Sequence, residues 1–86
     1  MSLSNILSDI EAERLRQFNM PGTESDVAKG PNDWIVAVTN LLCEAQCRHG
    51  MELTQAEFYR AFVKAGAVIA AALEHADHMK THKRLS

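Results

Sequence analysis

The run from Ala65 to Leu73 most constrains what this chain can fold into, because it holds nine apolar residues in a row. It lies inside a longer segment with helical periodicity, and a helix that is apolar on every side must be buried on more than one side. The run is too short for a membrane span, which needs roughly 20 apolar residues. We therefore predict the central helix of an all-α domain, with this run shared between the core and a subunit interface. A cofactor pocket is the alternative.

The beginning of this central helix is marked by the spacing of Thr54 and Glu57, which is that of a capping box. Leu53 and Phe58 are placed for a hydrophobic staple across the same turn. The pattern predicts a helix over about 55–82. Gly66 is costly inside it, by up to about 1 kcal/mol relative to alanine, and indicates a close contact with another helix. The apolar positions that repeat at three- and four-residue steps, and that we expect in the core, are Phe58, Ala61, Phe62, Ala65, Ile69, Ala72, Leu73, Ala76 and Met79.

Two further helices are predicted, over about 5–18 and about 32–49, separated by a loop over about 19–31 that Pro and Gly residues mark at both ends. Ser4 or Ser8 is the expected N-cap of the first helix. Asn32 or Asp33 is expected to cap the second, and Gly50 to end it.

The short connection over 50–53 predicts that the last two helices form an antiparallel hairpin. The sequence thus predicts one all-α domain over residues 1–86, made of three helices with a C-terminal antiparallel helical hairpin.

Composition favours association with further copies of the chain. Of the 86 residues, 47% are hydrophobic, which is more than three helices in a monomer can easily bury. We therefore expect a homo-oligomeric helical bundle, a dimer or a tetramer. The formal charge of −2 does not suggest nucleic-acid binding. The first residues lack the basic and apolar regions of a signal peptide, so we expect a cytoplasmic protein with no membrane partner.

Residues that often bind metals are present but form no familiar motif. Cys43 and Cys47 lie four residues apart on a predicted helix, and we expect structural thiols that are buried or half-buried. His75, His78 and His82 have spacings that place imidazoles on one helix face. A solvated helix end is the simpler interpretation of these three histidines, with a metal site as the alternative.

Arg14 and Arg16 on the first helix are candidates for contact with an anionic ligand or a partner protein. A solvated, charged helix face is the simpler interpretation. Trp34 and Lys64 are two further candidates for ligand or partner binding, and their interpretation depends on a family resemblance.

Three segments carry that resemblance. They are Ile10–Gln17 with its Glu-Arg-x-Arg-Gln core, Asp33-Trp34-Ile35, and the alanine-rich Phe62–Glu74. Together they resemble small phage- and prophage-encoded members of the MazG-like nucleotide pyrophosphohydrolase group. The resemblance implies an all-α protein that forms dimers or tetramers. It also implies magnesium-dependent cleavage of nucleoside triphosphates to monophosphates and pyrophosphate.

The chain departs from that family at the metal-binding motifs. The family's Glu-Glu-x-x-Glu motif falls on Asn40, Leu41 and Glu44, and its Glu-x-x-Asp motif falls on Ala61 and Lys64. Only Glu44 keeps a carboxylate, and Lys64 adds a positive charge where the ion would lie. Magnesium prefers several oxygen ligands. We therefore expect no cofactor and no hydrolysis by this mechanism, and Glu44 is the one candidate metal ligand.

Three hypotheses for function remain. The first is a non-enzymatic helical module of phage or prophage origin, which oligomerises and binds a protein or a nucleotide. The second is a magnesium-dependent pyrophosphohydrolase that uses other carboxylates. The third is a phage-type inhibitor of a host protein. The acidic residues considered for the second hypothesis are Glu11, Glu13, Glu44 and Glu74.

Overall fold

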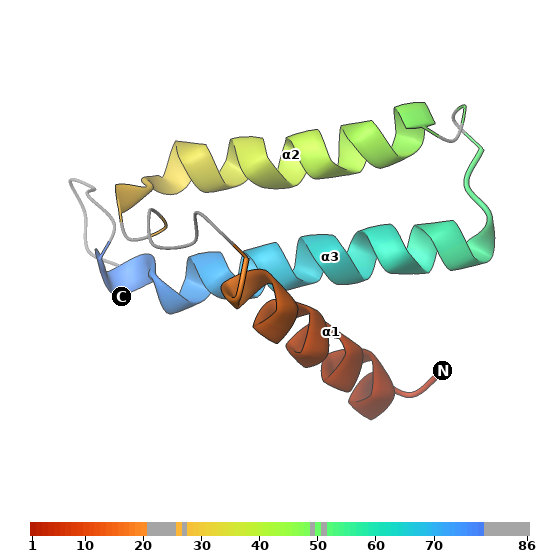
Figure 1. Cartoon of the computed structure of the whole chain (residues 1–86), viewed down its shortest axis with the longest axis horizontal. Helices are drawn as coiled ribbons and strands as arrows, with labels where there is room; N and C mark the ends of the chain where they lie inside the picture. Colours follow the sequence, from red (N-terminus) through yellow and green to blue (C-terminus); the bar gives the residue numbers. More distant parts are fainter. Residues whose placement is uncertain (21–25, 27, 49, 51, 79–86) are drawn as a thin grey trace.

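The computed structural model describes residues 1–20, 26, 28–48, 50 and 52–78. Its α-helices are α1 (Leu3–Phe18), α2 (Pro31–Arg48) and α3 (Gln55–Glu74), followed by a short 3₁₀ helix, η2 (Ala76–His78). Figure 1 shows α2 and α3 side by side in opposite directions, with α1 crossing α3 obliquely. Both α1 and α2 pack on α3. The predicted all-α chain with a C-terminal helical hairpin is therefore confirmed.

The first two helices begin slightly earlier than predicted. The N-cap of α1 is Ser2, whose hydroxyl accepts a hydrogen bond from the Asn5 backbone N–H at 3.2 Å. Helix α2 begins at Pro31. Proline suits the first position of a helix, because an N–H there would have no partner within the helix and proline has none. The Asp33 carboxylate then accepts a hydrogen bond from the Gly30 backbone N–H at 2.9 Å. At the other end, α2 stops at Arg48, and Gly50 has a φ of 65°, as suits a residue after a helix.

The capping box at the start of α3 is confirmed. The Thr54 hydroxyl accepts a hydrogen bond from the Glu57 N–H at 3.1 Å, and the Glu57 carboxylate accepts one from the Thr54 N–H at 2.8 Å. However, α3 ends at Glu74 instead of continuing to about residue 82. The His75 N–H bonds the carbonyls of Ala71 and Ala72 in the tighter pattern of a helix end. Residues 79–82 lie outside the described part of the chain.

The core is built mainly from small side chains. Its buried hydrophobic residues, among those described, are Trp34, Ala61, Ala65, Ala67 and Ala71. Alanine lets helix backbones approach closely but contributes little apolar area of its own. The Ala65–Leu73 run is thus buried on the sides facing α1 and α2. Its third side is exposed at Ile69 (46%) and Leu73 (70%), and the predicted subunit interface there stays a prediction.

Gly66 marks a close approach of α1 to α3, as its sequence position indicated. A Cβ atom added at Gly66 would lie 3.2 Å from Cδ1 and 3.4 Å from Cγ1 of Ile10. Ile10 is a half-buried residue of α1 and projects onto the α3 backbone at this point. The glycine therefore makes room for the α1 side chain that anchors the two helices to each other.

The two cysteines are exposed, so the expectation of buried or half-buried thiols is wrong. The side of α2 that faces α3 carries Trp34, Leu41 and Ala45, which are buried or half-buried. Cys43 and Cys47 lie away from this side of α2, and both are free thiols.

Replacing Gly66 with valine tests the close approach of α1 and α3. We expect Gly66→Val to lower the free energy of unfolding by about 1–3 kcal/mol, because the added methyl groups overlap Ile10. Ala56→Val, at an exposed position in the first turn of α3, is the matched control and carries only the smaller cost of a β-branched residue in a helix. Urea denaturation followed by circular dichroism measures both. Equal losses in the two variants would contradict the packing described here.

Candidate functional site

Arg14, a candidate for ligand binding, instead joins α1 to the end of α3. Its Nη2 and Nε donate hydrogen bonds to the two carboxylate oxygens of Glu74 at 3.0 and 3.2 Å. Only 14% of the Arg14 side chain is exposed, and its guanidinium lies 5.6 Å from the centroid of the Phe18 ring. A two-pronged pair of this kind fixes orientation as well as charge. The structure thus gives Arg14 a role in holding the helices together.

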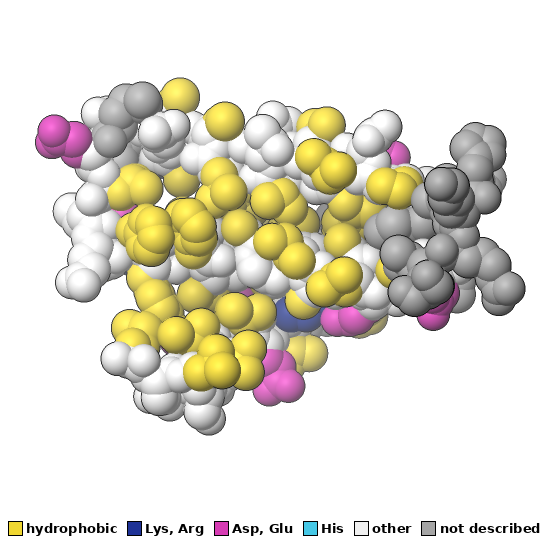
Figure 2. Space-filling view, turned by 180° about the vertical axis from the view of Figure 1, so that it is seen from behind, with side chains coloured by type: hydrophobic (Ala, Val, Ile, Leu, Met, Phe, Trp, Pro, Cys, Tyr) yellow, Lys and Arg dark blue, Asp and Glu magenta, His cyan; other side chains and the backbone are white. Residues whose placement is uncertain are grey.

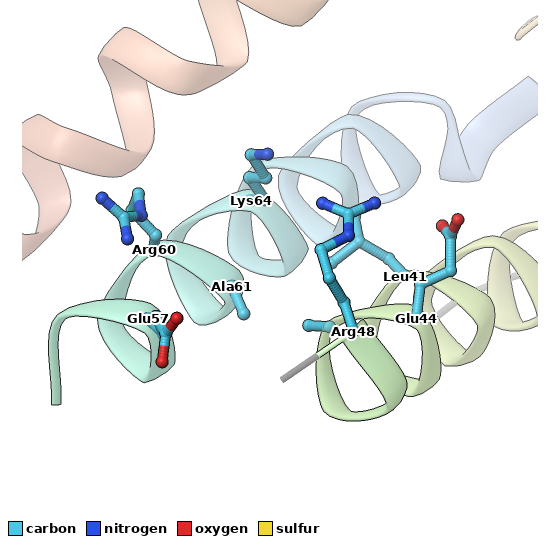
Figure 3. A pocket seen from close by; sticks show the side chains of 8 residues that line it. Leu41, Glu44, Arg48, Glu57, Arg60, Ala61 and Lys64 are labelled. Carbon is cyan, nitrogen blue, oxygen red and sulfur yellow. The ribbon is translucent and has the colours of Figure 1, made fainter. Parts of the chain in front are cut away.

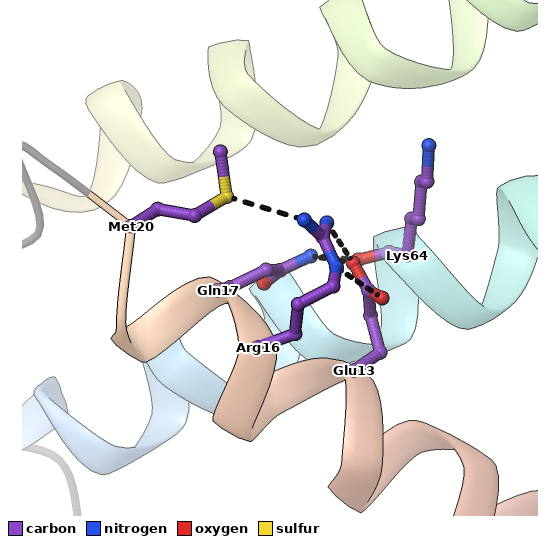
Figure 4. Close-up of polar contacts among 5 residues, drawn as sticks. All are labelled: Glu13, Arg16, Gln17, Met20 and Lys64. Atoms are coloured by element: carbon purple, nitrogen blue, oxygen red, sulfur yellow. Dashed lines mark hydrogen bonds and ion pairs between the residues drawn. The ribbon is translucent and has the colours of Figure 1, made fainter.

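Arg16 is bound by a neighbour on its own helix. Figure 4 shows its guanidinium on the carboxylate of Glu13, with a further contact to the sulfur of Met20 at 3.5 Å. Gln17 donates hydrogen bonds to Glu13 at 3.0 Å and to the backbone carbonyl of Lys64 at 3.3 Å. The hydrogen bond from Arg16 lowers the pKa of Glu13, although partial burial opposes this shift. Contact between Arg16 and an external anion stays a prediction.

Tyr59 and Asp9 form a third polar link between α1 and α3. The Tyr59 hydroxyl donates a hydrogen bond to an Asp9 carboxylate oxygen. This bond, together with desolvation and the negative charge of Asp9, raises the pKa of Tyr59 above its ordinary value of 10.0. The link therefore favours folding below that pH and is lost as the pH rises through the pKa of the folded protein.

Because Tyr59 is the chain's one tyrosine, its ionisation can be followed by near-ultraviolet absorbance of the phenolate. We expect a midpoint above pH 10.0. Asp9→Ala should lower this midpoint by removing both the acceptor and the negative charge. Glu11→Ala, which removes an exposed acid from the same helix, is the control and should leave the midpoint unchanged. A midpoint that is insensitive to Asp9→Ala would contradict the link.

Trp34, a candidate for partner binding, is the one large side chain among the described buried residues and is 5% exposed. Its ring stacks on His75 at a centroid distance of 5.9 Å, and the ammonium of Lys29 lies 4.7 Å from its centroid. The Trp34 Nε1 is buried and has no hydrogen-bond partner among the described residues. Trp34 thus joins α2 to the end of α3 and to the residues before α2.

A polar hollow lies between α2 and α3, with a volume of about 160 Å³. Figure 3 shows Glu44 and Arg48 projecting the same way from α2, and Arg60 and Lys64 projecting from α3. All four side chains belong to exposed residues. The remaining lining residues are Leu41, Ala45, Glu57 and Ala61.

The hollow brings together four of the five positions on which the family's metal motifs fall. Leu41, Glu44, Ala61 and Lys64 all line it, so the positions are adjacent although the acids are missing. Magnesium takes six oxygen ligands, including carboxylates. Glu44 projects beside Arg48 and shares the hollow with Lys64, so the side chains present do not fit a magnesium ion.

Two of the other acids considered for metal binding have separate partners, and the third, Glu11, is exposed on α1. Glu13 is bonded to Arg16, and Glu74 is bonded to Arg14. Within the described residues, no three His, Cys, Asp or Glu side chains are grouped as a metal ion would require.

An apolar face extends over α2 and α3 and continues onto α1. Figure 2 shows hydrophobic side chains gathered along it. One hollow lies on it toward the α2–α3 connection, lined on α3 by Phe58 and Phe62, and another lies at the other end of the hairpin, lined on α3 by Ile69 and Leu73. The α2 residues that line these hollows are Trp34, Ile35, Val38, Thr39, Leu42, Cys43, Ala45 and Gln46. Among the described residues, no Asp, Glu, Lys or Arg lines either hollow.

This face corrects the predicted core. Phe58 and Phe62 were expected inside, yet they are 50% and 49% exposed, and their rings stack on each other at 4.3 Å. Ile69 and Leu73 are exposed in the same way. Because the run is apolar on every side, periodicity could not indicate which side faces a neighbour. Side-chain size was the signal that could have indicated the buried sides, since only small residues fit between closely packed helices.

Comparisons with known proteins identify no relative: no protein-family model, curated protein or solved structure gives a significant match. Among the described residues, no helix has the length and apolar character to cross a bilayer.

Proposed function

We propose that this chain is a non-enzymatic helical module that oligomerises and binds through its apolar face. One observation carries the proposal: α3 buries four of its alanines and exposes four of its large apolar side chains. Phe58, Phe62, Ile69 and Leu73 are each between 46% and 70% exposed, whereas four alanines of the same helix are buried. Exposed apolar patches on this scale are typical of interaction surfaces.

The energetic argument follows from burial. Fully burying a leucine, isoleucine or phenylalanine contributes about 1.5–3 kcal/mol, so each half-exposed side chain leaves about 1 kcal/mol unused. A domain of this size is marginally stable by itself. Covering the face with another apolar surface would therefore add a large fraction of the total stability.

The resemblance to small phage proteins supports the same proposal. The four metal-motif positions around the polar hollow carry one carboxylate and one ammonium, while the helical framework is kept. A scaffold in this condition retains a surface for association without the ligands for catalysis. Inhibition of a host protein is the alternative in which another protein covers the same face.

A charge placed in the middle of the apolar face tests the proposal. We expect the native chain to exceed its monomer mass of 9.6 kDa in light scattering at micromolar concentrations. Phe62→Glu should shift it toward the monomer, because burying an unpaired carboxylate is costly. Val36→Glu is the matched control, since Val36 is 54% exposed but lines neither hollow. A monomeric native chain, or equal effects of both variants, would contradict the proposal.

The enzymatic alternative has its own test. We expect no magnesium-dependent release of pyrophosphate from a panel of nucleoside triphosphates. The physical reason is that one carboxylate beside Arg48 and Lys64 does not hold the ion. Turnover that depends on magnesium and disappears in Glu44→Ala would show that the chain is a hydrolase, while Glu52→Ala controls for the general loss of an acid.

A further inference from the structure

We infer that the occupant of the apolar face is a second copy of this chain. In this dimer the two α3 helices pack antiparallel across a two-fold axis at the level of Ala65 and Gly66. This inference rests on the proposed function and adds the identity of the partner and the register of the contact. Four observations carry it: the spacing of the exposed side chains, the placement of the two hollows, the absence of charge, and the area available.

The exposed apolar residues of α3 are arranged symmetrically along the helix. Phe62 and Ile69 lie equally far from the midpoint between Ala65 and Gly66, and so do Phe58 and Leu73. A two-fold axis perpendicular to α3 at that midpoint places Phe62 of one copy against Ile69 of the other. The same rotation places Phe58 against Leu73. In such an interface each contact occurs twice, as closed two-fold symmetry requires.

The same rotation brings each hollow of one copy opposite the other hollow of the second copy. The hollow lined by Ile69 and Leu73 comes to lie opposite the stacked pair of Phe58 and Phe62 in the other copy. The stacked rings are half exposed, and they are of a size to enter an open apolar hollow. A parallel arrangement would instead set the aromatic pair of one copy against the aromatic pair of the other.

Charge and area also favour a second copy. Since no described Asp, Glu, Lys or Arg lines either hollow, these described parts of the face can meet each other without placing like charges together. The four half-exposed side chains of α3 offer roughly 100 Å² each, given about 150–250 Å² for a whole aromatic side chain. That is about half of the roughly 800 Å² per partner found in stable interfaces. Ile35, Val38 and Leu42 of α2 extend the same surface.

Charge pairs placed across the predicted contact test the register. Phe62→Glu and Ile69→Lys should each weaken self-association by at least about tenfold. An equimolar mixture should recover a heterodimer, because antiparallel packing brings the introduced carboxylate against the introduced ammonium. The matched control mixes Phe62→Glu with Phe62→Lys, which would be rescued only in a parallel arrangement. Sedimentation velocity measures association, and circular dichroism checks that each variant stays helical.

Disulfide trapping gives a second measurement if the charged variants fail to fold. Phe62→Cys and Ile69→Cys chains, each also carrying Cys43→Ser and Cys47→Ser, are mixed and oxidised. We expect the mixed disulfide to exceed the disulfides between like positions. A dimer that cross-links only between like positions would overturn the register and leave the proposed function standing. A chain that is monomeric and does not cross-link would contradict both.

Discussion

The close contact of α3 with its two neighbours, made through alanine and glycine, is the constraint on which the rest of the structure depends. Small residues at Gly66 and at the buried alanines let α1 and α2 approach the α3 backbone. The resulting core contains little apolar area, and Trp34 is the one large side chain among its described buried residues. Large residues of α3 cannot occupy these contacts and therefore lie on the remaining side of the helix.

The polar contacts of α1 determine which side that is. Asp9, Arg14 and Gln17 bond to Tyr59, Glu74 and the Lys64 carbonyl, and together they fix the oblique crossing of α1 over α3. These contacts lie along one side of α3, and α2 lies along another. Between them α3 presents its phenylalanines, Ile69 and Leu73 to solvent. Local polar links thus position an apolar surface to which they contribute no charge.

Local sequence signals predicted local structure well. Thr54 and Glu57 form the capping box, Gly66 marks a helix contact, and the short connection after Gly50 joins an antiparallel hairpin. Each of these depends on residues close in sequence or on backbone sterics. The pairing of Arg14 with Glu74 could not be predicted, because it joins two helices across 60 positions. The exposure of the cysteines was missed for a similar reason, since a wide apolar stripe does not indicate which of its residues face α3.

The candidate site was likewise predictable from the sequence only in part. Leu41, Glu44, Ala61 and Lys64, on which the resemblance places metal motifs, line one hollow, but the resemblance could not weigh that hollow against the apolar face. The energies favour the face. An exposed ion pair contributes only about 0–1 kcal/mol, because water competes for each charge. Covering four half-exposed apolar side chains contributes about 1 kcal/mol apiece and acts on all of them together. By this comparison, the apolar face offers more free energy for association than the polar hollow does.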